Sequence, residues 1–186
     1  MITHSFHFKF LHPILVTLGL SFLMVTGLHA ATDLGLTGSG SVNAGTFDDA
    51  SFSVSPGAFL STRGADLSGW LLRVDFLGIE EVRDVRMTYA SRTTTWLLRK
   101  ADVVIKRRHY SLCGGIGLGI WNYRFRDRSD LRGAFGYSAE IDTPLGSLSG
   151  RKVALAIGYS GLNAPGTGLY DDSFHLQLKY RLLSFE

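Results

Sequence analysis

The stretch that decides the fold class runs from Tyr110 to Ile120 and reads YSLCGGIGLGI. Its even-numbered positions are mostly large and apolar, whereas its odd-numbered positions hold only Ser, Cys and Gly. Alternation with a period of two predicts a β-strand, because successive side chains of a strand point to opposite faces. A strand face in water normally carries Thr, Lys or Glu, and glycine there weakens the strand. The small face therefore needs another explanation.

A narrow closed barrel explains the small face. The interior of an eight-stranded barrel is just wide enough to be filled by side chains, so small positions on some strands make room for large ones on others. Large polar residues do occur opposite the apolar face in other segments. We expect these to form a charge network in the lumen: Arg73, Asp75, Arg132, Glu140, Asp142, His175, Lys179 and Arg181.

The same alternation recurs along most of the chain after residue 30, and no segment there shows an apolar stripe at helical spacing. The predicted strands are 33–44, 51–62, 68–77, 93–106, 109–122, 131–142, 150–160 and 172–183. These are long enough to cross a bilayer when tilted, and closing the sheet satisfies every backbone group in lipid. The predicted fold class is an all-β, eight-stranded antiparallel up-and-down transmembrane β-barrel.

Two segments depart from the simple pattern. Trp96 and Leu98 share one parity, whereas Ala101 and Val103 hold the other, and we expect a bulge near Arg99-Lys100 to reconcile them. The stretch 78–91 also changes phase, which fits either an extension of two strands or an extra hairpin.

Aromatic residues fall near both ends of the predicted strands. We take the amino terminus of the barrel to lie on the periplasmic side. The girdle at the periplasmic interface then holds Trp70, Tyr110, Tyr180 and Phe185, and the girdle at the outer interface holds Phe52, Trp96, Tyr123, Tyr159 and Phe174. Two aromatic girdles around an apolar band are typical of transmembrane barrels.

The first thirty residues predict a secretory signal peptide. They hold one Lys, no acidic residue and an apolar run over 14–28 that ends before Ala30 and Ala31. The run is shorter than the ~20 residues of a membrane-spanning helix. We expect cleavage after Ala30, leaving residues 31–186 as one barrel domain in the bacterial outer membrane of a Gram-negative cell envelope.

Composition excludes several classes of function. The chain holds 19 Lys and Arg against 16 Asp and Glu. A balance this close to neutral gives no support for nucleic-acid binding. Outside the predicted signal peptide only His109 and His175 remain, and Cys113 is the single cysteine. No metal site or cofactor is therefore expected.

The Gly-rich stretch and the final segment, FHLQLKYRL over 174–182, resemble the middle and closing strands of the small bacterial outer-membrane β-barrel family. This family usually ends on an aromatic residue, whereas here Phe185 is followed by Glu186. The resemblance implies insertion by the barrel-assembly machinery and contact with outer-membrane lipid and lipopolysaccharide.

The segment GYSGLNAPG over 158–166 is similar to the motif of the lipid A 3-O-deacylases. Ser160 matches the serine of that motif, but Gly158 stands where the motif has its histidine, so the general base is missing. Under the hydrolase hypothesis the catalytic candidates are Ser160 as nucleophile, His175 as a substitute base and Glu140 as the residue that orients His175. The simpler interpretation is that Ser160 is a small residue that faces the lumen.

We expect a non-enzymatic outer-membrane protein with a filled lumen and a structural or interaction role through surface loops centred on 123–130 and 161–171. Water-filled porin channels need about sixteen strands. The alternatives are a lipid A-modifying hydrolase and a soluble periplasmic barrel that binds a small apolar ligand.

Overall fold

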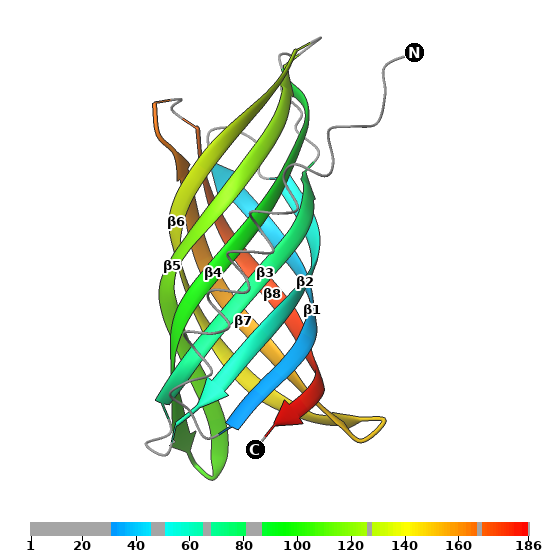
Figure 1. The fold of residues 1–186 in the computed structure, drawn as a ribbon, viewed down its shortest axis with the longest axis vertical. Coiled ribbons are helices and arrows are strands. Elements are labelled where there is room, and N and C mark those ends of the chain that lie inside the picture. Colours follow the sequence, from blue (N-terminus) through cyan, green and yellow to red (C-terminus); the bar gives the residue numbers. More distant parts are fainter. Residues whose placement is uncertain are drawn as a thin grey trace.

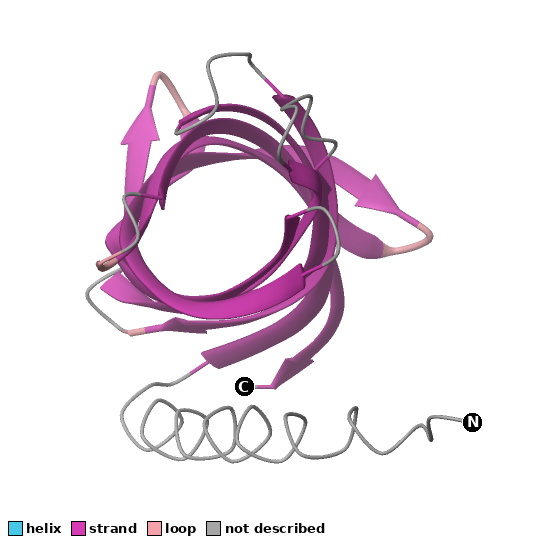
Figure 2. Cartoon of the chain, turned by 90° about the horizontal axis from the view of Figure 1, so that it is seen from above, coloured by secondary structure: helices cyan, strands magenta, loops and turns pink. Residues whose placement is uncertain are grey.

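The computed structural model describes residues 31–45, 51–64, 68–80, 87–125, 128–166 and 169–185, which form eight antiparallel strands. The strands are β1 (Ala31–Gly45), β2 (Ser51–Arg63), β3 (Ser68–Glu80), β4 (Met87–Ile105), β5 (Arg108–Phe125), β6 (Arg128–Leu148), β7 (Arg151–Ala164) and β8 (Leu169–Phe185). They close into a barrel that appears as a ring from above (Figure 2). The predicted fold class is confirmed, whereas the predicted signal peptide lies outside the described residues.

Each strand pairs with its neighbours in sequence, and β8 pairs with β1 to close the barrel. The closing pairs run from Thr32 opposite Phe185 to Gly45 opposite Asp171. Because the strand number is even, β1 begins and β8 ends at the same, lower end of Figure 1. The described part of the chain contains no helix long and apolar enough to cross a membrane.

The alternation read from the sequence separates an inner from an outer face. In β8, His175, Gln177 and Lys179 are buried in the lumen, whereas Phe174 and Leu176 are exposed on the outer wall. The same holds for β5, where Ile116 and Leu118 are 70% and 67% exposed and Cys113 is buried. These strands therefore present apolar side chains on the outer wall and place their polar side chains in the lumen.

Strand β4 corrects one prediction. Its pairing with β5 runs without a shift from Ala90 to Ile105, so the bulge near Arg99-Lys100 does not exist. Trp96 and Leu98 point into the lumen on the same parity as Lys100, and Trp96 therefore belongs to no outer girdle. Large apolar side chains are accepted inside because the lumen contains an apolar cluster as well as polar groups.

The strands are longer than predicted at several ends. β3 reaches Glu80 and β4 starts at Met87, so the described part of the 78–91 stretch extends these strands, and 81–86 lie outside the described residues. The predicted loop regions 123–130 and 161–171 are mostly strand ends of β5 to β8. β6 continues through Pro144 with a register shift and turns only at Ser149 and Gly150.

Candidate functional site in the barrel lumen

Three strands bring most of the predicted charged residues together in the middle of the lumen. Alternation places Arg73 and Asp75 on the inner face of β3, and Glu140 and Asp142 on the inner face of β6. β8 contributes His175, Gln177 and Lys179. Residues from β3, β6 and β8 thus meet across the barrel although they are up to 104 positions apart in sequence.

Arg73 lies at the centre of this cluster. Its side chain is 2% exposed and forms an ion pair with Glu140 across the lumen. Its Nε donates to Asp75 Oδ2 at 3.1 Å, and its guanidinium lies 5.6 Å from the Trp96 ring centroid. Trp96 Nε1 also donates to Asp75 Oδ2, at 3.0 Å. The buried guanidinium is therefore both charge-paired and hydrogen-bonded, as a charge in a low-dielectric interior must be.

Lys179 contacts the carboxylates of both Glu140 and Asp142 on β6. Its Nζ donates to Glu140 Oε1 at 2.5 Å and to the two oxygens of Asp142 at 2.9 and 2.8 Å. His175 Nε2 lies 3.5 Å from Glu140 Oε2. The Glu140 carboxylate thus accepts hydrogen bonds from both sides of the lumen and links β6 to β3 and β8.

Further ion pairs surround this central cluster, and sequence reasoning missed them. Asp102 pairs with Arg63 at 3.0 Å and with Lys100 at 3.5 Å, and it accepts a hydrogen bond from Ser111. Arg92 pairs with Asp171. Among the described residues, six acidic and six basic side chains other than histidine share these ion pairs, so the paired set is electrically balanced.

Two predicted members of the network lie elsewhere. Arg181 pairs with Asp33 at 2.8 Å, near the lower rim, and Ser184 donates to the same carboxylate. Arg132 lies on the inner parity of β6 but is exposed, several residues above Glu140. The central cluster formed by Arg73, Glu140 and Lys179 therefore lies between Arg181 at the lower rim and Arg132 towards the upper one.

The glycines of the inner face leave space for large neighbours. A Cβ added at Gly117 would overlap the Trp96 ring, and one at Gly158 would overlap the imidazole of His175. A Cβ at Gly35 would overlap the Phe59 ring. Small residues on β1, β5 and β7 therefore accommodate large residues on adjacent strands, as expected for a filled lumen.

The proposed catalytic set does not assemble as a triad. Ser160 and His175 line one polar pocket, which encloses about 360 Å³ with the open solvent at its mouth included. Ser160 Oγ shares a 3.0 Å hydrogen bond with Ser173 Oγ, whereas His175 Nε2 is directed at Glu140. No hydrogen bond joins Ser160 to His175 among the interactions of the described residues. Because both side chains face the lumen, neither reaches the outer wall where lipid acyl chains would lie.

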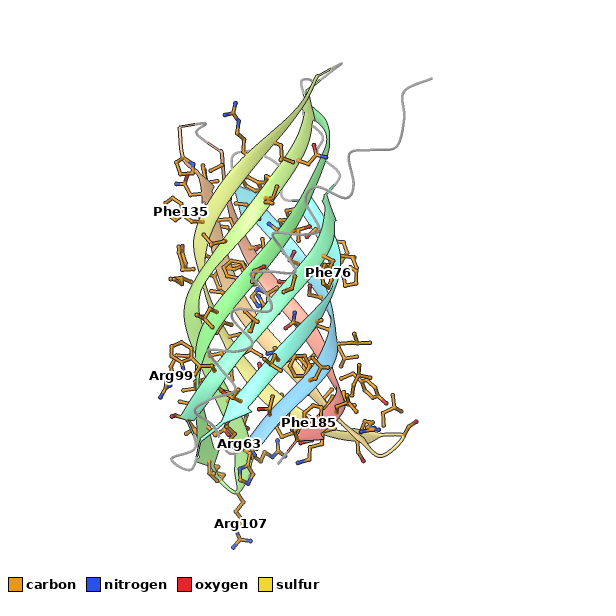
Figure 3. All side chains as sticks on the ribbon, viewed as in Figure 1. Arg63, Phe76, Arg99, Arg107, Phe135 and Phe185 are labelled. Atoms are coloured by element: carbon orange, nitrogen blue, oxygen red, sulfur yellow. The ribbon has the colours of Figure 1, made fainter. Side chains whose placement is uncertain are left out.

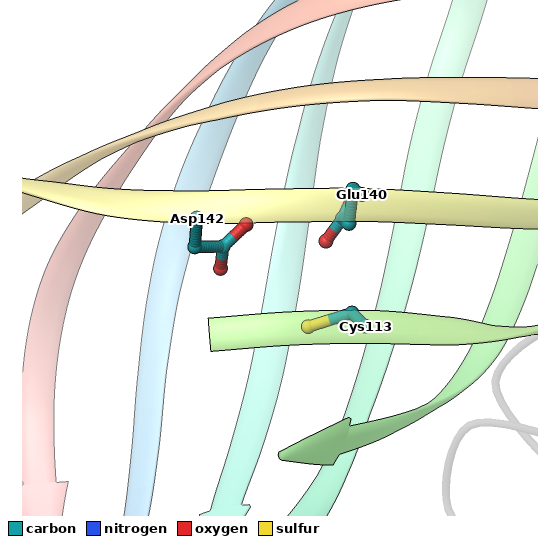
Figure 4. Close-up of side chains that lie close together, drawn as sticks. All are labelled: Cys113, Glu140 and Asp142. Carbon is teal, nitrogen blue, oxygen red and sulfur yellow. The ribbon is translucent and has the colours of Figure 1, made fainter. Parts of the chain in front are cut away.

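Cys113, Glu140 and Asp142 bring three potential metal ligands within 4.8 Å of one another (Figure 4). The Lys179 ammonium already lies against both carboxylates and supplies their counter-charge. The cluster is therefore explained as a lysine site, and it carries no argument for a metal.

The outer wall carries many apolar side chains, among them Phe76 and Phe135, which point outward from opposite sides of the barrel in Figure 3. Exposed large apolar residues occur on all eight strands, including Leu36, Phe52, Phe76, Leu97, Ile116, Phe135, Ile157 and Phe174. The ring of Tyr159 packs at a tilt against the rings of Tyr137 and Phe174, with centroids 6.1 and 4.9 Å away. Arg99 lies 5.1 Å from the Trp70 ring centroid on the outer face of β3 and β4. A water-soluble protein rarely exposes apolar patches of this extent.

The closed barrel, filled lumen and apolar wall define the fold of the small eight-stranded outer-membrane β-barrels. Neisserial surface protein A has a similar structure, with a TM-score of 0.56 at 8% sequence identity, over 83% of this chain and 100% of that chain. Ail, the attachment invasion locus protein of Yersinia pestis, is similar at a TM-score of 0.51 and 9% identity, with the same coverage. No protein-family model and no curated protein matches the sequence. At such low identity the similarity concerns the fold.

Proposed function

We propose that this chain is an integral protein of the bacterial outer membrane with a structural or interaction role and no enzymatic activity. The observation that carries the proposal is the distribution of polarity, with balanced ion pairs inside the barrel and large apolar residues outside. Lipid would contact the outer wall, and the strand ends at the upper rim would present the interaction surface to the cell exterior. Cleavage of residues 1–30 and insertion by the barrel-assembly machinery belong to the same proposal.

The filled lumen argues against a porin. Arg73, Glu140 and Lys179 bridge β3, β6 and β8 across the middle of the barrel. Trp96, Phe59 and Leu98 fill neighbouring parts of the interior. An ion would have to displace these contacts to pass, and the eight-stranded lumen offers no wider route.

Three measurements test the proposal. The protein should remain in the membrane pellet after alkaline carbonate extraction and should migrate with outer-membrane markers in a density gradient. In planar bilayers the purified barrel should give no stable conductance steps, with a sixteen-stranded porin as the positive control. Recovery in the periplasmic fraction without detergent would contradict the membrane location, and porin-like steps would contradict the closed lumen.

The geometry favours neither alternative function. A soluble barrel that binds an apolar ligand needs an apolar cavity and a polar exterior, whereas this barrel has the opposite arrangement. A lipid A hydrolase needs its nucleophile at the outer wall, whereas Ser160 is buried in the lumen and hydrogen-bonded to Ser173.

A further inference from the structure

Two hairpin turns at the end of the barrel where β1 begins and β8 ends carry a concentration of positive charge. We call these residues the basic collar: Lys106, Arg107 and Arg108 at the β4–β5 turn, and Arg151 and Lys152 at the start of β7. All five are exposed, and no ion pair to another described residue is found for any of them. Figure 3 shows Arg107 at the tip of the lower hairpin, directed away from the barrel.

Two described acidic residues on the strands that lead into the collar have other partners. Asp102 pairs with Arg63 and Lys100 in the lumen, and Asp142 pairs with Lys179. Every basic side chain of the described lumen network has an acidic partner, whereas the collar has none among the described residues. The five exposed basic side chains of the collar are therefore available to an external anion.

The two central residues of the β4–β5 turn adopt a backbone conformation that is unfavourable for long side chains. Lys106 and Arg107 both have positive φ, 47° and 66°, as the two central residues of a tight hairpin turn. That backbone favours Asn-Gly, because side chains larger than those of Gly, Asn and Asp are strained there. Turn geometry alone therefore does not account for two long basic residues at the tip.

Apolar side chains lie next to the charges at both turns. Val104 and Ile105 precede the first turn and are 53% and 54% exposed, and Leu145 and Leu148 are exposed before the second. In Figure 1 the β6–β7 hairpin leans away from the barrel at its lower end. An apolar segment that ends in basic residues suits the boundary between acyl chains and phosphates. A soluble acidic partner would explain the positive charge but not the exposed apolar side chains beside it.

We infer that the basic collar binds the headgroups of anionic phospholipids in the membrane leaflet at this end of the barrel. The inference rests on the proposed membrane location. Arg and Lys donate charge-assisted hydrogen bonds to phosphate oxygens, and basic residues next to an apolar anchor enrich anionic over zwitterionic lipid.

A tryptophan beside the collar can report which lipid is bound. Tyr110 lies on the outer parity of β5, two residues after Arg108, and is replaced as Tyr110→Trp in a Trp70→Phe background. The two remaining tryptophans, Trp96 and Trp121, are buried in the lumen and shielded from lipid. The reporter protein is reconstituted in phosphatidylcholine vesicles that contain a fraction of brominated phosphatidylglycerol or of brominated phosphatidylcholine. Bromine quenches a tryptophan only at short range.

The test variant replaces Lys106→Asn together with Arg107→Gly, which removes two charges and supplies the residues that the turn prefers. The variant should therefore fold at least as well as the parent. We expect the parent to favour the brominated anionic lipid by about threefold or more, a ratio that falls towards one in the variant and in high salt. The matched control, Arg124→Gln with Arg128→Gln, removes two charges from the opposite end and should keep the parental ratio.

Equal quenching of the parent by the two brominated lipids would overturn the inference while leaving the membrane location intact, since both lipids still reach the wall. A preference that survives in the turn variant would also overturn it. Absence of quenching by either lipid would contradict both the inference and the membrane location.

Discussion

Position 117 illustrates how one small residue shapes the interior. Gly117 leaves the space that the indole of Trp96 occupies, and the Trp96 N–H then reaches Asp75. A larger residue at position 117 would displace the ring and break that hydrogen bond.

We therefore predict that Gly117→Val destabilises the barrel by about 1–3 kcal/mol, the usual cost of overpacking a filled interior. Urea unfolding in lipid vesicles, followed by tryptophan fluorescence, measures this. Gly133→Val is the matched control, because a Cβ at Gly133 meets nothing within 4 Å. Equal stability of the two variants would show that the lumen at this level is not filled.

Lys179 supplies the positive charge that Glu140 and Asp142 share. Replacing Lys179→Met leaves the buried Glu140 and the partly buried Asp142 with one fewer cation, and breaking a buried ion pair costs about 3–5 kcal/mol. The double variant Lys179→Met with Asp142→Asn removes one charge of each sign and leaves Glu140 paired with Arg73, so it should recover most of that loss. A Lys179→Met barrel as stable as the parent would contradict the network.

Replacing Ser160 tests the hydrolase hypothesis directly. Since its hydroxyl faces Ser173 in the lumen, we predict that Ser160→Ala changes stability by no more than about 1 kcal/mol, the worth of one hydrogen bond. Lipid A from cells expressing parent or variant should have the same mass as lipid A from cells lacking the protein. Loss of one acyl chain that requires Ser160 would establish the enzyme.

At this scale, side-chain parity predicted which residues face the lumen, but it did not predict which of them meet. Arg73, Glu140 and Lys179 come together, whereas Arg181 meets Asp33 and Arg132 lies higher on β6. The height of a residue in the barrel depends on the stagger between strands, which parity does not encode. Lys100 and Asp102 were missed because the apolar Trp96 and Leu98 suggested the wrong phase for β4.

Among the elements, the strand centres were predicted well and their ends poorly. The observed β8 spans 169–185 against a predicted 172–183, and β6 extends to Leu148 although the predicted strand ends at residue 142. β6 tolerates Pro144 at a register shift in its pairing with β7, where the regular hydrogen-bond ladder is already interrupted. For residues 78–91, the local alternation favoured neither an extension of the two flanking strands nor an extra hairpin, because both structures satisfy it.

The outer face of β8 yields a prediction that depends on depth. Leu178 lies in the middle of the strand, opposite Gly38 on β1, whereas Leu183 lies near its lower end, opposite Leu34. We predict that Leu178→Arg costs about 2–4 kcal/mol and Leu183→Arg about 0–1 kcal/mol, since an arginine on the lipid face is worst at the bilayer midplane. Unfolding titrations in vesicles measure the two costs, and equal small costs would mean that this wall does not face lipid.

At the scale of the whole molecule, the lumen network and the apolar wall both depend on one closed barrel in a lipid bilayer. The lumen network satisfies its charges only because β1 and β8 close the ring, and the apolar wall is stable only against lipid. Closure also pairs every strand edge, which an open sheet of this size would leave exposed.

The most direct test is electrophoretic heat-modifiability of the protein from a purified outer-membrane fraction, with unheated and boiled samples compared in detergent. A closed transmembrane barrel resists detergent until it is heated, so we expect the unheated band to migrate differently from the boiled one. A single band at the same position in both samples, from a protein recovered in the soluble periplasmic fraction, would contradict the closed barrel in the membrane.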